Sequence, residues 1–207
     1  MPRIFLPVCL TFYFIKVMLG AYMCMKDLIM KNFFVFFCLI AMPMSALGEP
    51  AWLTDFKQDV SAVYHSDKWE LYMPVHTWHN RAMYDKNKTD DYWERPYGGG
   101  LGKYIIDEKG NQHSLYAMFF LDSHANWQPI AGYAWEKKWY LDEAGDLRFG
   151  AGFTAFLTAR EDYYYVPFPA ALPLASIEYK NFAVQSTYIP GYYNFGNVLF
   201  TWVKWKF

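Results

Sequence analysis

Residues 127–158, WQPIAGYAWEKKWYLDEAGDLRFGAGFTAFLT, decide the fold of this chain. On both sides of a short turn, bulky apolar residues recur at every second position, which is the period of a β-strand. In the first half these residues are Trp127, Tyr133, Trp135 and Trp139. We expect this aromatic face to point outward and the even positions, including Ile130, Gly132 and Ala134, to point inward.

The second half of the stretch follows the same rule. Its outward positions are expected to be Leu147, Phe149, Phe153 and Leu157. The inward positions Gly150, Gly152 and Thr154 are small, so they predict free space inside the structure, unless the glycines mark bends where the barrel closes. An aromatic outer face that alternates with a different inner face is typical of a membrane barrel.

Eight strands with this period follow one another along the chain. They are predicted at residues 68–83, 96–106, 113–121, 127–139, 147–158, 171–179, 182–190 and 196–207. Short turns at 107–111, 142–146 and 180–181 alternate with longer loops near 84–95, 122–126, 159–170 and 190–195. This alternation predicts an all-β, eight-stranded antiparallel transmembrane β-barrel. The last strand resembles the assembly signal of bacterial outer-membrane barrels in its apolar face, Leu199, Val203, Trp205 and Phe207.

The composition agrees with this class. Aromatic residues make up 22% of the 207 residues, yet the mean hydropathy is only −0.07. No apolar run of about 18 residues, the length of a spanning helix, follows residue 48. Of 19 basic and 20 acidic residues, four basic and one acidic precede residue 49, so the remainder carries 15 and 19. This acidic balance predicts that nucleic acid is not a partner.

Residues 1–48 are predicted to be a signal segment ahead of one domain at 49–207. The segment has a positive start, an apolar core and a small-x-small cleavage site, at Met30-Lys31-Asn32, Phe33–Met42 and Ala46-Leu47-Gly48. Within it, residues 1–24 are either a misassigned start or a second membrane segment. All the cysteines lie in the segment, so the domain has neither a thiol nucleophile nor a disulfide. They are Cys9, Cys24 and Cys38.

A helix is predicted at residues 50–64, directly before the first strand. Pro50 suits a first helical turn. Apolar residues then recur at helical spacing, at Trp52, Phe56, Val60 and Val63. Such an amphipathic helix either lies in a membrane interface or packs on the body of its own domain.

The barrel interior is predicted to hold a hydrocarbon chain. Residues 115–121 and 170–177 are apolar on both faces, which does not suit a water-filled pore. An eight-stranded barrel is either filled by its own side chains or holds one small ligand. At about 0.8 kcal/mol for each buried methylene, a long acyl chain would contribute roughly 10 kcal/mol of gross binding free energy.

His79, Asp122 and Ser123 are the candidate catalytic residues. His79 lies in the first predicted strand, just before the first long loop, and the other two follow the apolar run 115–121, so all three are expected on the long-loop side. Histidine, serine and aspartate are the usual groups for moving an acyl group. His124, beside Ser123, is a rival base.

Neither a metal nor a cofactor is expected. A metal site built from His76, His79 and His124 would need the first two on one face of the strand. Residues three apart point to opposite faces, so this site is excluded. The G-x-S-x-G nucleophile elbow of α/β-hydrolases is also absent from the sequence.

Short motifs follow one another from about residue 50 to Phe207 without large gaps. They are Trp78-His79, Tyr84-Asp85-Lys86, Lys88-Thr89-Asp90, Glu94-Arg95-Pro96, Gly98-Gly99-Gly100, Asp107-Glu108-Lys109-Gly110-Asn111, Leu115-Tyr116-Ala117-Met118, Pro129-Ile130-Ala131-Gly132-Tyr133, Gly152-Phe153-Thr154-Ala155, Thr158-Ala159-Arg160, Leu172-Pro173-Leu174-Ala175-Ser176 and Tyr188-Ile189-Pro190-Gly191. In this order they resemble the lipid A palmitoyltransferase (PagP) family.

The resemblance implies a monomeric acyltransferase of the bacterial outer membrane. Members of this family move a palmitoyl chain from the sn-1 position of a glycerophospholipid to a hydroxyacyl chain of lipid A in lipopolysaccharide. The resemblance implies essential roles for His79, Asp122 and Ser123. It also implies a role in lipopolysaccharide recognition for Lys88 and a role in phospholipid gating for Tyr193.

Further roles follow from the same resemblance. Three prolines match interruptions in strand pairing, where lipids are thought to enter sideways, because proline cannot donate to a ladder. They are Pro74, Pro96 and Pro190. Our mechanistic hypothesis is that His79 acts as general base on the acceptor hydroxyl, with Asp122 orienting it. Ser123 either polarises the ester carbonyl or serves as a transient nucleophile.

Two positions depart from the family pattern. Ala134 stands where the family commonly has the glycine that measures acyl-chain length. The added methyl is expected to shorten the fitting chain by roughly one or two carbons, so that selectivity lies slightly below, or is looser than, sixteen carbons. Gln112 stands where the family has tryptophan.

Two other interpretations remain open from the sequence. A non-enzymatic small outer-membrane barrel, for adhesion or membrane integrity, would need neither His79 nor a hollow interior. A soluble lipid carrier of the lipocalin type would not need the outward tryptophans or the strand ending at Phe207.

Overall fold

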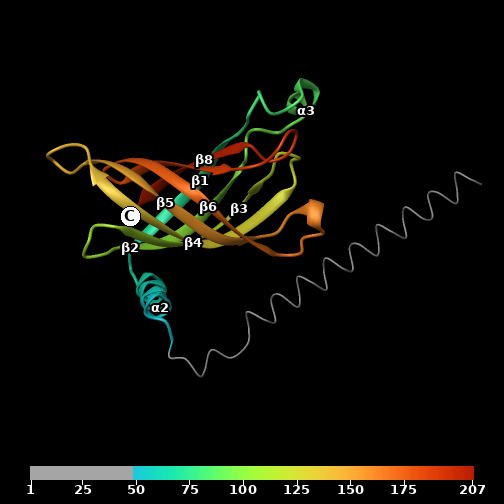
Figure 1. The fold of residues 1–207 in the computed structure, drawn as a ribbon. Coiled ribbons are helices and arrows are strands. Elements are labelled where there is room, and N and C mark those ends of the chain that lie inside the picture. The colour runs from blue at the N-terminus through green and yellow to red at the C-terminus, as the bar shows by residue number, and fades with distance from the viewer. Residues whose placement is uncertain (1–48) are drawn as a thin grey trace, which may run out of the picture. The chain divides into compact units, whose positions relative to one another are not determined.

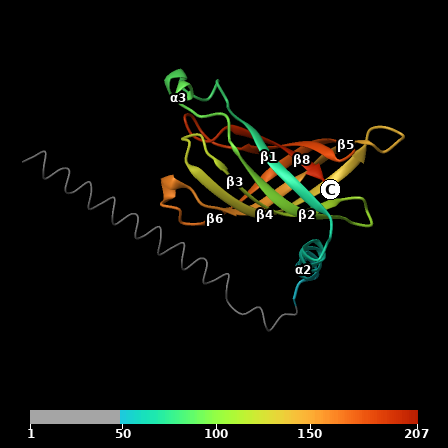
Figure 2. The ribbon, with the colours of Figure 1, turned by 180° about the vertical axis from the view of Figure 1, so that it is seen from behind.

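The computed structural model describes residues 49–207, in which eight strands close into one antiparallel barrel (Figures 1 and 2). The strands are β1 (Trp69–His79), β2 (Gly98–Ile106), β3 (Gln112–Leu121), β4 (Trp127–Tyr140), β5 (Leu147–Thr158), β6 (Phe168–Tyr179), β7 (Phe182–Ile189) and β8 (Val198–Lys206). β1 pairs with β8, which closes the sheet. The predicted barrel is therefore confirmed. The signal segment predicted at residues 1–48 lies outside the described residues.

The long connections contain structure that the period of two does not predict. The first predicted strand reaches residue 83, but β1 ends at His79, and a short helix, α3 (Lys86–Asp90), follows in the loop. The third long loop holds a single 3₁₀ turn, η2 (Glu161–Tyr163), and β6 begins at Phe168 rather than at residue 171. Figure 1 shows α3 at the end of the barrel opposite the short hairpins.

A further helix, α2 (Ala51–Tyr64), lies where the sequence predicts one at residues 50–64. Its Phe56 ring meets the Tyr133 ring edge-on, with ring centroids 5.1 Å apart. The Asp59 carboxylate lies 3.4 Å from the His113 ring. These contacts are those of a helix that packs on its own domain. Within the described part of the chain, no helix combines the length and the apolar character needed to cross a membrane.

The predicted inner and outer faces of β4 are confirmed. Ile130 and Ala134 are buried inside the barrel, whereas Trp127 and Trp139 are exposed on its outer face. Tyr133 is the exception, because it points outward and is nevertheless only 8% exposed. The cover comes from Phe56 of α2, which no pattern within β4 could reveal.

A bulge in β1 reverses which of its residues face inward. Pro74 pairs with Trp202 of β8, but His76 pairs with Thr201, so one extra residue is inserted between them. Before this point the even positions are buried, and after it the odd positions Thr77 and His79 are buried. A bulge bends a strand and re-aims its side chains. His79 therefore points into the barrel, although unbroken alternation would turn it outward.

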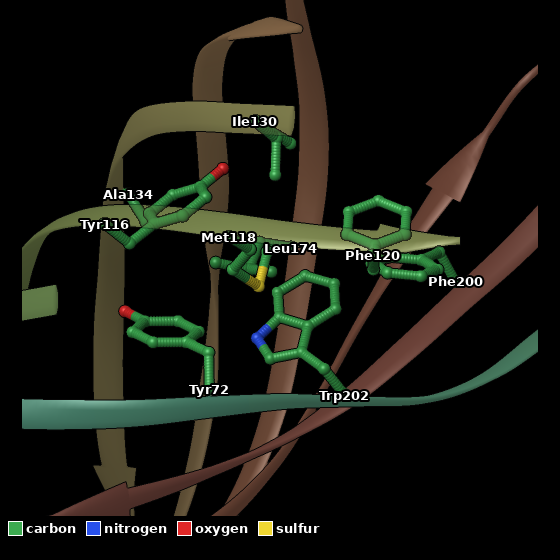
Figure 3. Close-up of a cluster of buried hydrophobic side chains, with 9 residues drawn as sticks. All are labelled: Tyr72, Tyr116, Met118, Phe120, Ile130, Ala134, Leu174, Phe200 and Trp202. Carbon is green, nitrogen blue, oxygen red and sulfur yellow. The ribbon is translucent and has the colours of Figure 1, made fainter. Parts of the chain in front are cut away.

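The middle of the barrel is filled by a cluster of apolar and aromatic side chains, which we call the central cluster (Figure 3). It consists of Tyr72, Tyr116, Met118, Phe120, Ile130, Ala134, Leu174, Phe200 and Trp202. Figure 3 shows Met118, Leu174 and Trp202, from three strands, pointing toward one another. On the long-loop side of this cluster the interior is open, and on the short-turn side it is not.

A buried ionic network closes the short-turn side of the barrel. Lys204 Nζ lies 3.0 Å from Glu70 Oε1 and 3.9 Å from Glu136 Oε2. Further ion pairs centre on Glu178, which contacts Lys138, Arg148 and Lys206. Gln112 joins the network by donating a hydrogen bond of 2.7 Å to Glu70 Oε1. Gln112, one of the two departures from the pattern of the resembled family, is thus a polar member of this network.

The prediction that the inward Gly150 leaves room for a ligand is wrong. A Cβ at this position would lie 2.3 Å from Ser176 Oγ and 2.7 Å from Glu136 Oε1. Side chains of the neighbouring strands β4 and β6 fill the space beside the glycine. The residue pattern of β5 alone does not reveal them. The free interior is therefore confined to the long-loop half.

Candidate active site

The long-loop half of the barrel contains a cavity of about 410 Å³. Its deeper wall is apolar, with Met118, Phe120, Ile130, Phe156 and Phe200 among its lining residues. Polar side chains gather at the mouth, namely His79, Lys88, Asp122, Ser123 and Arg160. A cavity of this size, apolar inside with a few convergent polar groups, is typical of a site for a small apolar ligand or chain.

His79 and Ser123 meet at this mouth. His79 is only 3% exposed and ends β1, and Ser123 lies in the loop between β3 and β4. The Ser123 hydroxyl lies 3.1 Å from His79 Nε2, within hydrogen-bond reach. The rings of Tyr92 and Tyr84 pack on the imidazole at 4.4 and 5.4 Å between ring centroids. The predicted neighbourhood of His79 and Ser123 is present in the structure.

The carboxylate on the other ring nitrogen comes from Glu94, not from Asp122 as expected. Glu94 Oε1 lies 3.1 Å from His79 Nδ1 and also accepts the backbone N–H of His79 at 3.2 Å. Its second oxygen accepts a hydrogen bond of 2.8 Å from Arg81. Burial alone would raise the pKa of the Glu94 carboxyl, but the hydrogen bonds from Arg81 and His79 hold the pKa below its ordinary value.

Asp122 is instead engaged within its own loop. Its Oδ1 accepts the backbone N–H groups of His124 and Asn126, both at 2.9 Å, which shapes the turn that carries Ser123. Its Oδ2 lies 3.3 Å from the Arg160 guanidinium. Asp122 thus supports the loop that carries Ser123 rather than the His79 ring.

Three side chains at the mouth have the composition of a metal site. The ligand atoms of Asp122, His124 and Asp162 lie within 4.8 Å of one another. The Arg160 guanidinium, however, lies 3.3 Å from Asp122 and 2.9 Å from Asp162. The carboxylates of Asp122 and Asp162 therefore already have the Arg160 guanidinium as a shared cationic partner, in the place where a metal ion would bind.

Lys88 and Tyr193 lie on two of the loops that surround the mouth. Lys88, on α3, lines the cavity. The Tyr193 hydroxyl donates a hydrogen bond of 2.5 Å to Asp85, and the Asn194 amide donates one of 2.8 Å to the same carboxylate. These hydrogen bonds lower the pKa of the Asp85 carboxyl. They also join the α3 loop to the loop between β7 and β8.

Ala134 lies in the central cluster, 6% exposed, and pairs with Ser114 of β3 and Thr154 of β5. Of the described residues, those that line the cavity include Thr154 and Tyr116, whose hydroxyls lie 2.6 Å apart, but not Ala134. The alanine therefore packs behind the residues that form the deep end of the cavity.

Sequence reasoning missed Glu94 as a partner of His79. Glu94 is fifteen residues away, in a loop without period, where an acidic residue is ordinarily solvated. The motif Glu94-Arg95-Pro96 marked the segment as part of a resemblance but gave it no chemical role. Backbone hydrogen bonds join this loop to Thr77 on one side and to Ser123 on the other, and these bonds are visible only in the folded chain.

Comparison with known proteins gives a consistent result. Residues 59–204 match the family model described as "Antimicrobial peptide resistance and lipid A acylation protein PagP". The chain is 58% identical over 148 residues to the "Lipid A acyltransferase PagP" of Laribacter hongkongensis, covering 72% of this chain and 71% of that protein. It is 47% identical over 175 residues to the "Lipid A palmitoyltransferase PagP" of Escherichia coli K12, covering 84% and 94%. A Yersinia enterocolitica "Lipid A acyltransferase PagP" is 53% identical over 150 residues, covering 72% and 74%.

Proposed function

This chain belongs to the PagP family of lipid A acylation proteins, and from that membership we infer that it is an acyltransferase that moves a palmitoyl chain to lipid A. The observation that carries the assignment to this site is the pairing of His79 Nε2 with the Ser123 hydroxyl at the mouth of an apolar cavity. A barrel without enzymatic activity would need neither the buried imidazole nor the hollow behind it.

We propose that the transferred chain comes from the sn-1 position of a glycerophospholipid and lies in the cavity during transfer. The apolar wall supports this, since each buried methylene of a guest chain contributes about 0.8 kcal/mol. The ester at the head of the chain would then lie among His79, Ser123 and Asp122. Lys88, at the same mouth, would meet the phosphates of lipopolysaccharide, and Tyr193 would gate the phospholipid.

In the first half of the proposed reaction, the Ser123 oxygen attacks the ester carbonyl carbon while its proton passes to His79 Nε2. The bond from the carbonyl carbon to the glycerol oxygen then breaks, and that oxygen takes the proton from Nε2 and leaves as a lysophospholipid. In the second half, the lipid A hydroxyl gives its proton to Nε2 and attacks the acyl-serine. The Ser123 oxygen leaves and recovers the proton, so no cofactor is consumed.

We propose the bacterial outer membrane as the location and a monomer as the working form, after removal of residues 1–48. The location is supported by outward aromatic residues such as Trp127 and Trp205, which are exposed around the barrel. The monomer is supported by the closure of the barrel within one chain.

Replacing His79 by alanine tests the function. We expect His79→Ala to abolish the added acyl chain in lipid A mass spectra, because no base remains beside Ser123, while the barrel keeps its heat-modifiable mobility in gel electrophoresis. His76→Ala is the matched control, since His76 lies on the exposed face beyond the β1 bulge, and it should retain transfer. Lipid A that is acylated equally by the His79→Ala protein would remove this site from the reaction.

Labelling the donor tests the origin of the chain. Cells or vesicles receive a glycerophospholipid whose sn-1 chain alone is isotopically labelled, and the label is then sought in lipid A. We expect it to appear there, with the corresponding lysophospholipid. Label found only when it is placed at sn-2 would contradict the proposed donor position.

A further inference from the structure

We infer that Glu94 is the positioning residue of the active site, whose carboxylate holds the proton of neutral His79 on Nδ1 and so leaves Nε2 free to accept the Ser123 proton. This inference rests on the proposed acyl transfer and deepens it by assigning the acid that works through His79. Asp122 then shapes the serine loop, and the hydrogen-bonded series runs from Ser123 through His79 to Glu94.

The first step of the argument is the charge of Glu94. Its two oxygens receive two donors whose direction is fixed, the Arg81 guanidinium and the backbone N–H of His79. These donors lower the pKa of the carboxyl against the opposing effect of burial, so Glu94 is ionised at neutral pH. An ionised carboxylate can only accept hydrogen bonds. The His79 nitrogen that faces it, Nδ1, must therefore carry a proton.

The second step concerns the other ring nitrogen. A neutral imidazole carries one proton, so with Nδ1 protonated Nε2 has a free lone pair. The Ser123 oxygen, 3.1 Å from Nε2, can then donate its proton in that direction. This is the arrangement that a base needs in order to activate a hydroxyl. With the opposite tautomer, Nε2–H would face Ser123 as a donor and could not remove its proton.

The third step is the placement of Glu94 by its backbone. The carbonyl of Glu94 accepts the backbone N–H of Thr77, two residues before His79, at 3.0 Å. The backbone N–H of the preceding residue, Trp93, donates to the carbonyl of Ser123 at 2.8 Å. One short segment is thus bonded on one side to the strand that carries His79 and on the other to the loop that carries Ser123.

The surroundings of the ring leave this role to Glu94. In the part of the chain that the structure describes, the ring is flanked by the rings of Tyr84 and Tyr92 and by Ser123 at Nε2. Two further groups influence the charge of the His79 ring from a distance. They are Arg81, which lies in the same loop as Glu94, and His124, which lies in the loop that carries Ser123. Asp122 is occupied by backbone N–H groups and Arg160.

Replacing Glu94 by glutamine in the full-length protein is the direct test. The amide can donate its N–H to Nδ1, so the ring is expected to move its proton to Nε2. We expect kcat to fall about 10²–10⁴-fold, as for an amide in the corresponding place of a serine–histidine–carboxylate triad, with KM within about threefold of the wild-type value. Glu94→Asp keeps a carboxylate and should recover part of kcat. Glu108→Gln, in an exposed short turn at the other end of the barrel, is the matched control.

A spectroscopic readout separates positioning from mere support of the fold. Nitrogen-15 NMR of labelled histidine, in detergent micelles at a pH where the ring is neutral, reports which nitrogen of His79 carries the proton. We expect Nδ1–H in the wild-type and Glu94→Asp proteins and Nε2–H in Glu94→Gln. His79→Ala assigns the resonances. The wild-type measurement alone is decisive if the glutamine variant does not fold.

Three results would overturn the inference. They are Nε2–H in the neutral wild-type ring, a Glu94→Gln protein within tenfold of wild-type kcat, and a Glu94→Asp protein no more active than Glu94→Gln. The first of these does not depend on the identity of the acceptor, because the tautomer is measured without substrate. A wild-type protein that fails to acylate lipid A would instead contradict the proposed function.

Discussion

At the scale of single residues, the site depends on one inserted residue in β1. Val75 and His76 are both exposed in succession, which shifts the buried positions from even to odd and turns His79 inward. Pro74, directly before the bulge, cannot donate to the ladder, and proline in a sheet is confined to such irregular places. Without the bulge, the imidazole would face outward, away from Ser123.

Ala134 provides a prediction at this scale. We expect Ala134→Gly to lengthen the preferred acyl chain by about one carbon, because removing the methyl frees space behind Tyr116 and Thr154, which form the deep end of the cavity. Ala131→Gly is the matched control, because Ala131 lies on the outer face of the same strand, β4. This change should destabilise the strand by a similar amount and leave the acyl-chain length unchanged. Chain length is measured by mass spectrometry of the modified lipid A. An unchanged chain in Ala134→Gly would place the ruler on other residues.

The sequence anticipates some of these residues and not others, for a physical reason. His79 and Ser123 were predicted because each lies next to a strand end and carries reactive chemistry. Glu94 was not predicted, because its role depends on a loop held between Thr77 and Ser123 by two backbone hydrogen bonds. Asp122 was predicted as the partner of His79, but residues adjacent in sequence to Ser123 are used by their own turn.

At the scale of elements, each strand changes character along its length. The inward residues of β8 run from Val198 and Phe200 near the loops through Trp202 to Lys204 and Lys206 near the turns. The period of two gave the correct faces for these positions. It did not indicate that the lysines are buried, because their carboxylate partners lie on β1, β4 and β6. Pairing across a barrel cannot be read from one strand.

Lys204 carries the prediction for the ionic network. Lys204→Met leaves Glu70 and Glu136 with less compensating charge in a buried place, so we expect a loss of about 3–5 kcal/mol in the free energy of unfolding. Lys137→Met is the control, since Lys137 is an exposed lysine on the outer face of β4. The measurement is the urea dependence of the heat-modifiable form in detergent. A Lys204→Met protein as stable as the control would show that the network contributes specificity rather than stability.

At the scale of the whole molecule, the barrel is closed but not uniformly paired. β1 pairs with β2 only over Trp69–Tyr72, although β1 continues to His79. β6 pairs with β7 only from Leu174 onward, although β6 begins at Phe168. Both unpaired stretches lie on the long-loop side, beside the cavity. The ionic network closes the opposite end, so the side wall is where a lipid tail held in a membrane could reach the interior.

Reversible closure of one unpaired stretch tests this path. Leu172 and Ile189 both line the cavity, and continuing the pairing of Leu174 with Thr187 by two residues would place them opposite each other. Because residues 49–207 contain no cysteine, the two thiols of a Leu172→Cys, Ile189→Cys protein can form only the intended disulfide within one copy of the domain, and non-reducing gel electrophoresis separates any bridge between copies. We expect oxidation to lower transfer at least tenfold and reduction to restore it, since the bridge narrows the gap between β6 and β7. Ala155→Cys with Ala171→Cys is the matched control, because these residues pair directly on the outer face of the continuous β5–β6 ladder. Full transfer by the oxidised Leu172→Cys, Ile189→Cys protein would direct attention to the gap between β1 and β2, where the same reversible bridge can be built.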